Sequence, residues 1–131
     1  MPYGCAEAAK GNHMPRDRYI YKALTPQQWA EFQKSTLFTG SPADYADGYI
    51  HLSLASQLKA TLDKWYPNQK EVALLQIEAE TIAIDLKYEV SRGGAEFPHL
   101  YADLPMTAVR QVWVVSPDAG VYRLPRDLKA N

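Results

Sequence analysis

Cysteine, net charge and long apolar runs are the features that this chain has least of. Cys5 is its single cysteine, so no disulfide can form within the chain, and we expect a reducing, cytoplasmic compartment. Its 14 basic and 15 acidic residues give a net charge of −1, which excludes a global field that attracts nucleic acid or anionic membranes. No apolar run approaches the roughly 18 residues of a membrane-spanning helix, and residues 1–18 lack the apolar core of a signal peptide. We therefore expect neither secretion nor membrane contact.

The length of 131 residues fits one domain, which would bury roughly two thirds of the surface that the unfolded chain exposes. We predict a flexible leader at residues 1–18, a globular domain at 19–124 and a short tail at 125–131. Met14 stands just before the first strand-like segment and offers an alternative start.

Helix signals are concentrated in the first half of the chain. Thr25 and the proline after it supply an N-cap and a first position for a helix that reaches about residue 34. Trp29 and Phe32 lie three residues apart on this helix, so we expect both to pack on a sheet. Residues 35–48 are rich in Ser, Gly, Pro and Asp, which favours a loop that acts as a lid or as the rim of a substrate site.

Strand-like segments dominate the rest of the chain. Ser53 is placed to cap a second helix at residues 54–65. The continuous apolar run at residues 72–75 predicts a central strand that is buried on both faces. Two helices followed mainly by strands predict a single compact α+β domain with a mixed or antiparallel sheet. The predicted strands are residues 19–24, 49–52, 71–78, 84–89, 109–115 and 121–124.

Two histidines stand inside strand-like apolar segments and carry most of the functional signal. The first is in residues 48–53 (GYIHLS), where a period of two places Tyr49, His51 and Ser53 on one face. An imidazole beside a hydroxyl group can hold a ribose or activate a nucleophile. Alternatively, His51 is a core histidine that bonds a backbone carbonyl.

The second histidine belongs to residues 91–101 (SRGGAEFPHLY), in which His99 and Tyr101 share one face if the segment is a strand. Arg92 offers a planar donor fork for a phosphate or carboxylate, and Glu96 could accept a hydrogen bond from a ribose hydroxyl. The Gly93-Gly94 pair would let a ligand reach backbone amides. The alternatives are a simple glycine turn, an ion pair between Arg92 and Glu96, and a structural His99.

Metal and serine-hydrolase sites find little support. His51 and His99 are far apart in the sequence and lack a third ligand at zinc-site spacing, although Glu96 is an available carboxylate, so we expect no metal. Ser53 is not in the Gly-x-Ser-x-Gly turn that exposes a hydrolase nucleophile.

Four short motifs follow one another along the chain: residues 20–22 (IYK), 47–53 (DGYIHLS), 91–94 (SRGG) and 97–101 (FPHLY). In this order they resemble the DUF952 family, which comprises small, mostly bacterial proteins of unknown function. The resemblance spans about residues 19–115.

That family is similar in fold to ADP-ribosyltransferases, including the RNA 2'-phosphotransferase branch, which implies a split sheet with an NAD-binding cleft. By this resemblance His51 contacts ribose with Ser53 beside it, and either Tyr66 or Tyr101 stacks on nicotinamide. Either Glu96 or Glu89 supplies the carboxylate. The chain departs from the pattern at residues 109–115, where no acidic residue occurs and Gln111 is the nearest polar substitute.

Together these observations yield three functional hypotheses. The chain is an enzyme that uses NAD or ADP-ribose, a non-catalytic module that binds a nucleotide or another phosphorylated small molecule, or a protein-interaction domain. For the first, the predicted catalytic residues are His51, Glu96 and His99. The predicted cofactor-binding residues are His51, Ser53, Arg92, Gly93, Gly94 and Tyr101.

Overall fold

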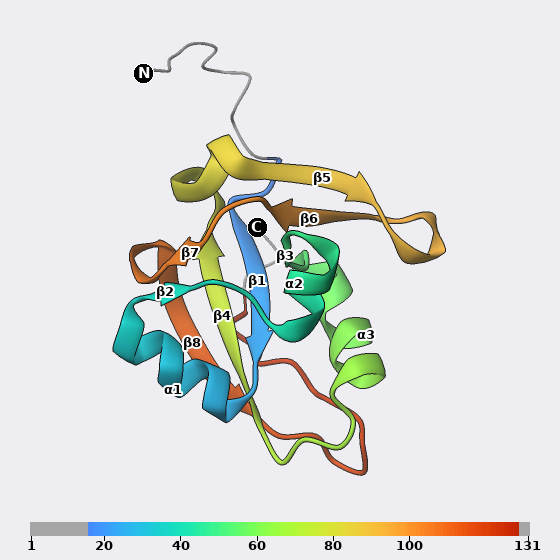
Figure 1. Cartoon of the computed structure of the whole chain (residues 1–131). Helices are drawn as coiled ribbons and strands as arrows, with labels where there is room; N and C mark the ends of the chain where they lie inside the picture. The colour runs from blue at the N-terminus through green and yellow to red at the C-terminus, as the bar shows by residue number, and fades with distance from the viewer. Residues whose placement is uncertain (1–15, 129–131) are drawn as a thin grey trace.

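The computed structural model describes residues 16–128, and at Arg92 it describes the backbone only. Within these residues, three antiparallel sheets are joined by α-helices and short 3₁₀ turns (Figure 1). The predicted α+β class with antiparallel sheets is therefore confirmed. Most of the predicted leader, with Cys5 and Met14, and residues 129–131 of the predicted tail lie outside the described residues.

The first sheet has the strand order β1-β4-β8. Its strands are β1 (Tyr19–Leu24), β4 (Val72–Glu78) and β8 (Val109–Val115). Every residue of β4 except Glu78 is buried, as its continuous apolar run predicted. The central position of β4 is also confirmed, because it pairs antiparallel with both neighbours.

A hydrophobic core lies on each face of this sheet. Phe32 of α1 (Pro26–Ser35) packs on one face with partly buried Trp29, and their ring centroids are 5.9 Å apart. Leu58 and Leu62 of α3 (Ala55–Trp65) pack on the other face. Alternate residues of β1 follow this division, since Ile20 and Leu24 belong to the first core and Tyr21 and Ala23 to the second.

The second sheet has the order β3-β6-β5, with β3 (Ile50–His51), β5 (Leu86–Val90) and β6 (Glu96–Leu100). Its β5 begins two residues later than predicted, because Ala79–Asp85 forms 3₁₀ turns. Further 3₁₀ turns are Arg92–Gly94 and Met106–Ala108. The strand predicted at residues 121–124 is wrong: this segment makes one isolated bridge, between Asp118 and Val121.

A short segment after β3 joins the two three-stranded sheets. The amide of Leu52 donates to the carbonyl of Pro98 on β6 at 3.0 Å. One residue later, Ser53 and Tyr21 of β1 exchange two backbone hydrogen bonds of 2.8 and 2.9 Å. His51 consequently stands at the junction between the sheets, where residues from both can reach it.

The loop predicted at residues 35–48 is largely structured. It contains β2 (Leu37–Phe38), which pairs with β7 (Leu104–Pro105), and the short helix α2 (Pro42–Asp47). A capping box stabilises the N-terminus of α2. The hydroxyl of Ser41 accepts a hydrogen bond from the Asp44 amide at 3.2 Å, and the Asp44 carboxylate accepts one from the Ser41 amide at 2.8 Å. Gly48 ends the helix at a φ of 86°.

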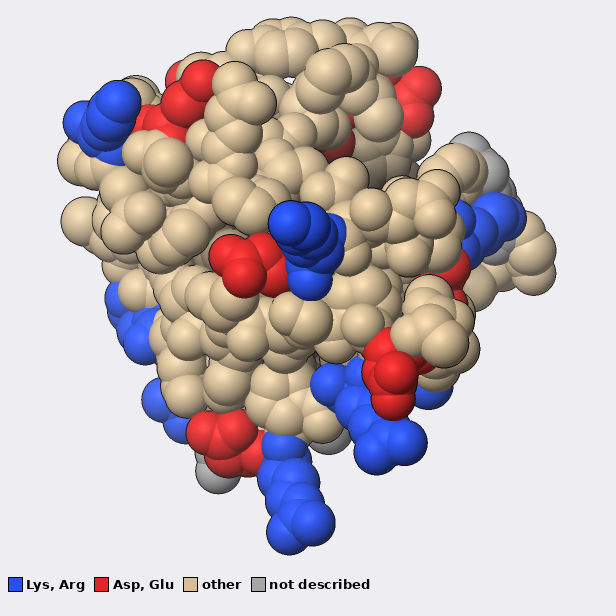
Figure 2. Space-filling view, turned by 90° about the horizontal axis from the view of Figure 1, so that it is seen from below, with Lys and Arg blue, Asp and Glu red and all other residues tan. Residues whose placement is uncertain are grey.

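The surface shows no large region of one charge on the face seen in Figure 2, where basic and acidic side chains of the described residues are interspersed. This distribution agrees with the net charge of −1 for the whole sequence. Within residues 16–128, no helix has the length and apolar character needed to cross a bilayer.

Candidate functional site

The carboxylate of Asp44 on α2 organises one half of the candidate site. Asp44 is 3% exposed, and one carboxylate oxygen accepts from the backbone amide of His51 at 3.0 Å. The ammonium group of Lys22 on β1 lies 3.2 Å from the other oxygen and donates to the carbonyl of His51 at 2.8 Å. Burial disfavours the charged carboxylate, but the hydrogen bond from His51 and the charge of Lys22 outweigh it and lower the pKa of Asp44.

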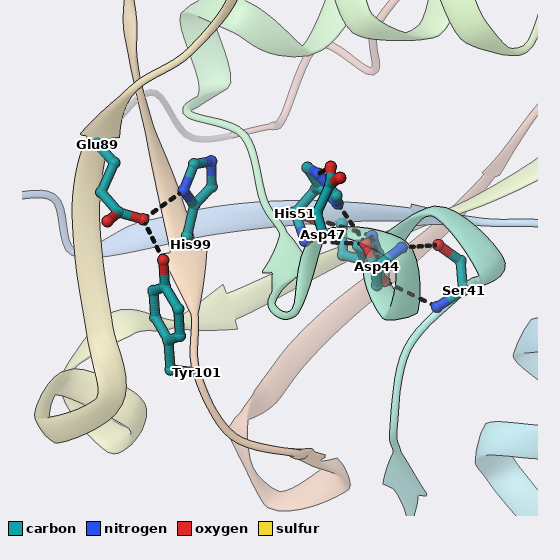
Figure 3. A network of polar contacts seen from close by, with 8 residues as sticks. Ser41, Asp44, Asp47, His51, Glu89, His99 and Tyr101 are labelled. Atoms are coloured by element: carbon teal, nitrogen blue, oxygen red, sulfur yellow. Dashed lines mark hydrogen bonds and ion pairs between the residues drawn. The ribbon is translucent and has the colours of Figure 1, made fainter.

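His51 is held between two carboxylates, as the right-hand group of residues in Figure 3 shows. Its Nδ1 lies 2.5 Å from the buried carboxylate of Asp44, and its Nε2 lies 2.8 Å from Asp47 at the end of α2. The hydrogen bond to Asp44 is the main cause that raises the pKa of His51, with burial opposing it and Asp47 adding to it. The site therefore favours an imidazolium that can act as a general acid.

Glu89 on β5, His99 on β6 and Tyr101, which directly follows β6, form the other half of the site at the left of Figure 3. One carboxylate oxygen of Glu89 lies 2.7 Å from His99 Nδ1 and accepts from the Tyr101 hydroxyl at 2.6 Å. The hydrogen bond from Tyr101, followed by that from His99, lowers the pKa of Glu89. The same bond raises the pKa of Tyr101 to about 12. The prediction that His99 and Tyr101 share one face is thus confirmed.

Tyr49 connects the two halves. Its ring stacks on His99 with centroids 4.0 Å apart and an interplanar angle of 21°. The same ring contacts those of His51 and Tyr101, at centroid distances of 4.8 and 5.3 Å. We call Tyr49, His51, His99, Tyr101 and their carboxylate partners Asp44, Asp47 and Glu89 the histidine cluster.

Within the described part of the chain, one polar atom of the His99 ring has no hydrogen-bond partner. His99 is 2% exposed, and no described residue hydrogen-bonds to its Nε2. An unpaired buried nitrogen costs free energy, so Nε2 is available to a hydrogen-bonding group of a ligand that reaches it. Tyr49 also lines a cavity of about 210 Å³, which lies between α2 and the end of β6.

Three of the predicted site residues come together here, whereas Ser53, Glu96, Gly93 and Gly94 lie elsewhere. His51, His99 and Tyr101 belong to the histidine cluster. The hydroxyl of Ser53 instead lies 3.3 Å from that of Thr61 on α3, and Ser53 is not the helix cap, because α3 begins after Leu54.

Glu96 lies apart from the cluster and forms an exposed ion pair with Arg16 at 2.8 Å. The strand alternation of β6 places Glu96 and His99 on opposite faces. Gly93 and Gly94 form the turn between β5 and β6, with φ of 68° and 79°. The side chain of Arg92 is outside the described structure, so its predicted role stays a prediction.

Two alternatives for the stacking and polar roles lie away from the cluster. The Tyr66 hydroxyl donates to the carbonyl of Ala23 at 3.4 Å, and burial in the second core raises the pKa of Tyr66 to about 12. Gln111 on β8 donates to Asp127 at 3.3 Å. Tyr101 and Glu89 are the alternatives that stand in the cluster.

The sequence did not identify Lys22, Asp44 and Asp47 as site residues. Asp44 could have been suspected from the sequence. Ser41-Pro42 repeats the pattern of an N-cap residue and a proline that starts α1, and the acidic residue follows two positions later. Lys22 could be suspected from its position between Ile20 and Leu24 on the apolar face of β1. Among the described residues, no group of three or more histidine, cysteine, aspartate or glutamate side chains is placed to hold a metal ion.

Comparison with known proteins identifies the family. The model of the family described as "Protein of unknown function (DUF952)" matches residues 23–112. The chain belongs to the DUF952 family. A crystal structure of protein CC0527 from Caulobacter crescentus is 43% identical, with a TM-score of 0.77, and the match covers 80% of this chain and 93% of that one.

A solution NMR structure of the same Caulobacter crescentus protein is 42% identical to this DUF952 chain, with a TM-score of 0.72. That match covers 81% of this chain and 91% of the other. A comparison with curated proteins gave no match. These findings show the family and its α+β fold, whereas the similarity to ADP-ribosyltransferases stays a prediction.

Proposed function

We propose that this DUF952 protein binds a nucleotide of the NAD or ADP-ribose type at the histidine cluster and catalyses its cleavage or transfer. The observation that carries the proposal is the stack of Tyr49 on His99, whose buried Nε2 has no partner among the described residues, beside a second histidine held by two carboxylates. An aromatic ring, paired imidazoles and a cavity are the elements that recognise a ring joined to a ribose.

Each residue of the cluster has a specific role in this proposal. The imidazolium of His51 donates from Nε2 to a ribose oxygen that replaces Asp47, whose side chain is 52% exposed and can move aside. Glu89 accepts from a ribose hydroxyl and stabilises positive charge that develops on the sugar when the bond to the leaving group breaks. Glu89 takes this role in place of Glu96, which faces away from His99.

The charges around the cluster decide which part of such a ligand it holds. Asp44, Asp47 and Glu89 are carboxylates, and Lys22 is already paired with Asp44. The excess of carboxylates favours binding of the positively charged nicotinamide ring of NAD and disfavours binding of the negatively charged pyrophosphate. The turn at Gly93 and Gly94 precedes β6, at the end of that strand that is remote from His99, and the pyrophosphate would lie toward this turn.

A non-catalytic binding module is the second candidate, and one observation favours it. On β8, where a transferase of the resembled fold would place its acidic residue, Gln111 bonds Asp127 instead of facing the histidine cluster. A module of this kind would bind the same nucleotide without turnover.

Thermal unfolding with NAD, ADP-ribose, nicotinamide or inorganic phosphate tests the proposal, followed by detection of free nicotinamide. A ligand at 100 times its Kd stabilises the native state by about 2.7 kcal/mol, which is readily measured. We expect NAD or ADP-ribose to stabilise the wild type and His51→Gln to abolish the effect. Glu96→Gln is the matched control and should respond like the wild type.

Release of nicotinamide in the wild type and its loss in His51→Gln would support an enzyme. Stabilisation without release would favour the binding module. If neither NAD nor ADP-ribose stabilises the wild type, the proposed function is wrong and an interaction domain becomes the better hypothesis.

A further inference from the structure

The cavity beside the histidine cluster has walls of three chemical kinds. Tyr45 and Tyr49 supply aromatic rings, Asp103 supplies a carboxylate, and the paired β3 and β6 residues Ile50 and Leu100 supply an apolar wall. Its volume of about 210 Å³ is enough for a small organic group rather than a whole nucleotide.

Both aromatic walls are held in place by other residues of the chain. The hydroxyl of Tyr45 lies 2.5 Å from that of Thr39, which joins the ring to the segment before α2. The ring of Tyr49 is fixed by its stack on His99. A cavity with rings already in position loses little conformational entropy when it binds a ligand.

The charge in this cavity is negative. Among the described residues, no lysine or arginine lines it. Asp44 lines it but is compensated by Lys22 and His51, whereas no described residue forms a hydrogen bond or ion pair with the carboxylate of Asp103. A carboxylate and tyrosine faces attract a cation, and the apolar wall favours one whose nitrogen carries methyl groups.

An ammonium group already contacts the neighbouring tyrosine. The Nζ atom of Lys87 lies 4.9 Å from the centre of the Tyr101 ring, whose other neighbour is Tyr49. The tyrosine faces in this part of the molecule therefore accommodate positive charge from within the chain.

We propose that the cavity bounded by Tyr45, Tyr49 and Asp103 is a binding site for a small methylated ammonium ion, with the cation between the two rings and facing the carboxylate. This inference does not depend on NAD or ADP-ribose binding. It assigns a ligand class to a cavity that shares Asp44 and Tyr49 with the histidine cluster and is otherwise lined by residues outside that cluster.

Titration with choline chloride, followed by two-dimensional NMR of the full chain, tests the site. The neutral isostere 3,3-dimethylbutan-1-ol has the same shape without the charge, and sodium chloride controls for ionic strength. We expect saturable shifts of the amides of residues 45–50 and 100–103 with choline, and about tenfold weaker binding of the alcohol, because only the cation interacts with ring faces and carboxylate.

Four variants sharpen the result. Asp103→Asn and Tyr45→Leu should each weaken choline binding severalfold, while Asp118→Asn, which removes an exposed carboxylate outside the cavity, should not. Tyr45→Phe keeps the ring and should retain binding, so it separates loss of the wall from loss of the Thr39 contact. The amide spectrum of each variant shows whether it is folded.

Equal binding of choline and the alcohol, no saturable shift with choline, or unchanged binding by folded Asp103→Asn would each overturn the inference. Choline binding without any effect of NAD would support this site and reject the proposed function. Binding of NAD without binding of choline would support the proposed function and reject this site.

Discussion

Replacing Asp44 by asparagine should reveal how strongly the candidate site depends on one buried charge. The substitution preserves the shape of the side chain but leaves the ammonium of Lys22, which is 6% exposed, without its counter-charge. Removal of one partner from a buried ion pair typically costs about 3–5 kcal/mol.

The structure also sets an upper limit to this loss. Burial already lowers the pKa of Lys22, and Asp44 opposes that effect. Without Asp44, the folded chain can hold Lys22 in its neutral form. Deprotonating a lysine that has the ordinary pKa of the unfolded chain costs about 4.6 kcal/mol at pH 7, so the loss of stability should not exceed this value. We therefore expect Asp44→Asn to lose about 3–4.5 kcal/mol, a large share of the roughly 5–15 kcal/mol of a typical domain.

Urea unfolding followed by circular dichroism measures the loss. Its pH dependence above the range in which His51 titrates identifies the cause, because Asp44→Asn also removes the partner that raises the pKa of His51. If Lys22 is neutral in the folded variant, the unfolded chain binds more protons, and the stability of the variant relative to the wild type should rise with pH. The rise should reach about 1.4 kcal/mol per pH unit below the ordinary lysine pKa.

Two matched variants complete the test. Asp47→Asn removes a mostly exposed carboxylate from the same helix and should cost no more than about 1 kcal/mol. Lys22→Met combined with Asp44→Leu removes both charges and should recover much of the loss. A loss below about 1 kcal/mol in Asp44→Asn, or no rise of its relative stability with pH, would refute the reasoning.

Three further predictions concern His51, Tyr49 and Thr36. Because its pKa is raised on folding, His51 contributes stability that is complete below about pH 6.5 and is lost as the pH rises through the higher folded value; His51→Gln should lose this pH dependence in urea unfolding. Tyr49→Ala should uncover His99, so that diethylpyrocarbonate modifies it severalfold faster by peptide mass mapping, and an unchanged rate would show that Tyr49 is not its cover. Thr36 ends α1 with a φ of 63°, a conformation that glycine adopts without strain, so Thr36→Gly should raise the free energy of unfolding in urea by about 0.5–1 kcal/mol. An unchanged or lower stability would contradict this prediction.

The strongly patterned elements could be predicted from the sequence. The apolar run of β4 identified the centre of the first sheet, and Thr25 with its proline marked the start of α1, because each signal is local. The strand predicted around Tyr122 was wrong: its ring is fully buried and its hydroxyl donates to the carbonyl of Tyr66, so its apolar character reflects packing and not strand pairing.

The histidine cluster could be predicted only in part. His51 and His99 are directly opposite in the β3–β6 register, and the strand period placed Tyr101 beside His99. Asp44 on α2 and Lys22 on β1 are 22 residues apart in sequence, and no local pattern encodes a contact between them. Glu89 reaches the cluster instead of Glu96 because the β5–β6 pairing places Glu89 close to His99, whereas Glu96 projects to the other face.

The most direct test of the account is an NMR titration of the His51 and His99 imidazole signals with NAD and with ADP-ribose. We expect the signals of both rings to shift together and saturate with one affinity, because the ligand must displace Tyr49 and Asp47 to reach them. Unchanged imidazole signals at ligand concentrations that saturate any other part of the spectrum would contradict the assignment of the nucleotide site to the histidine cluster.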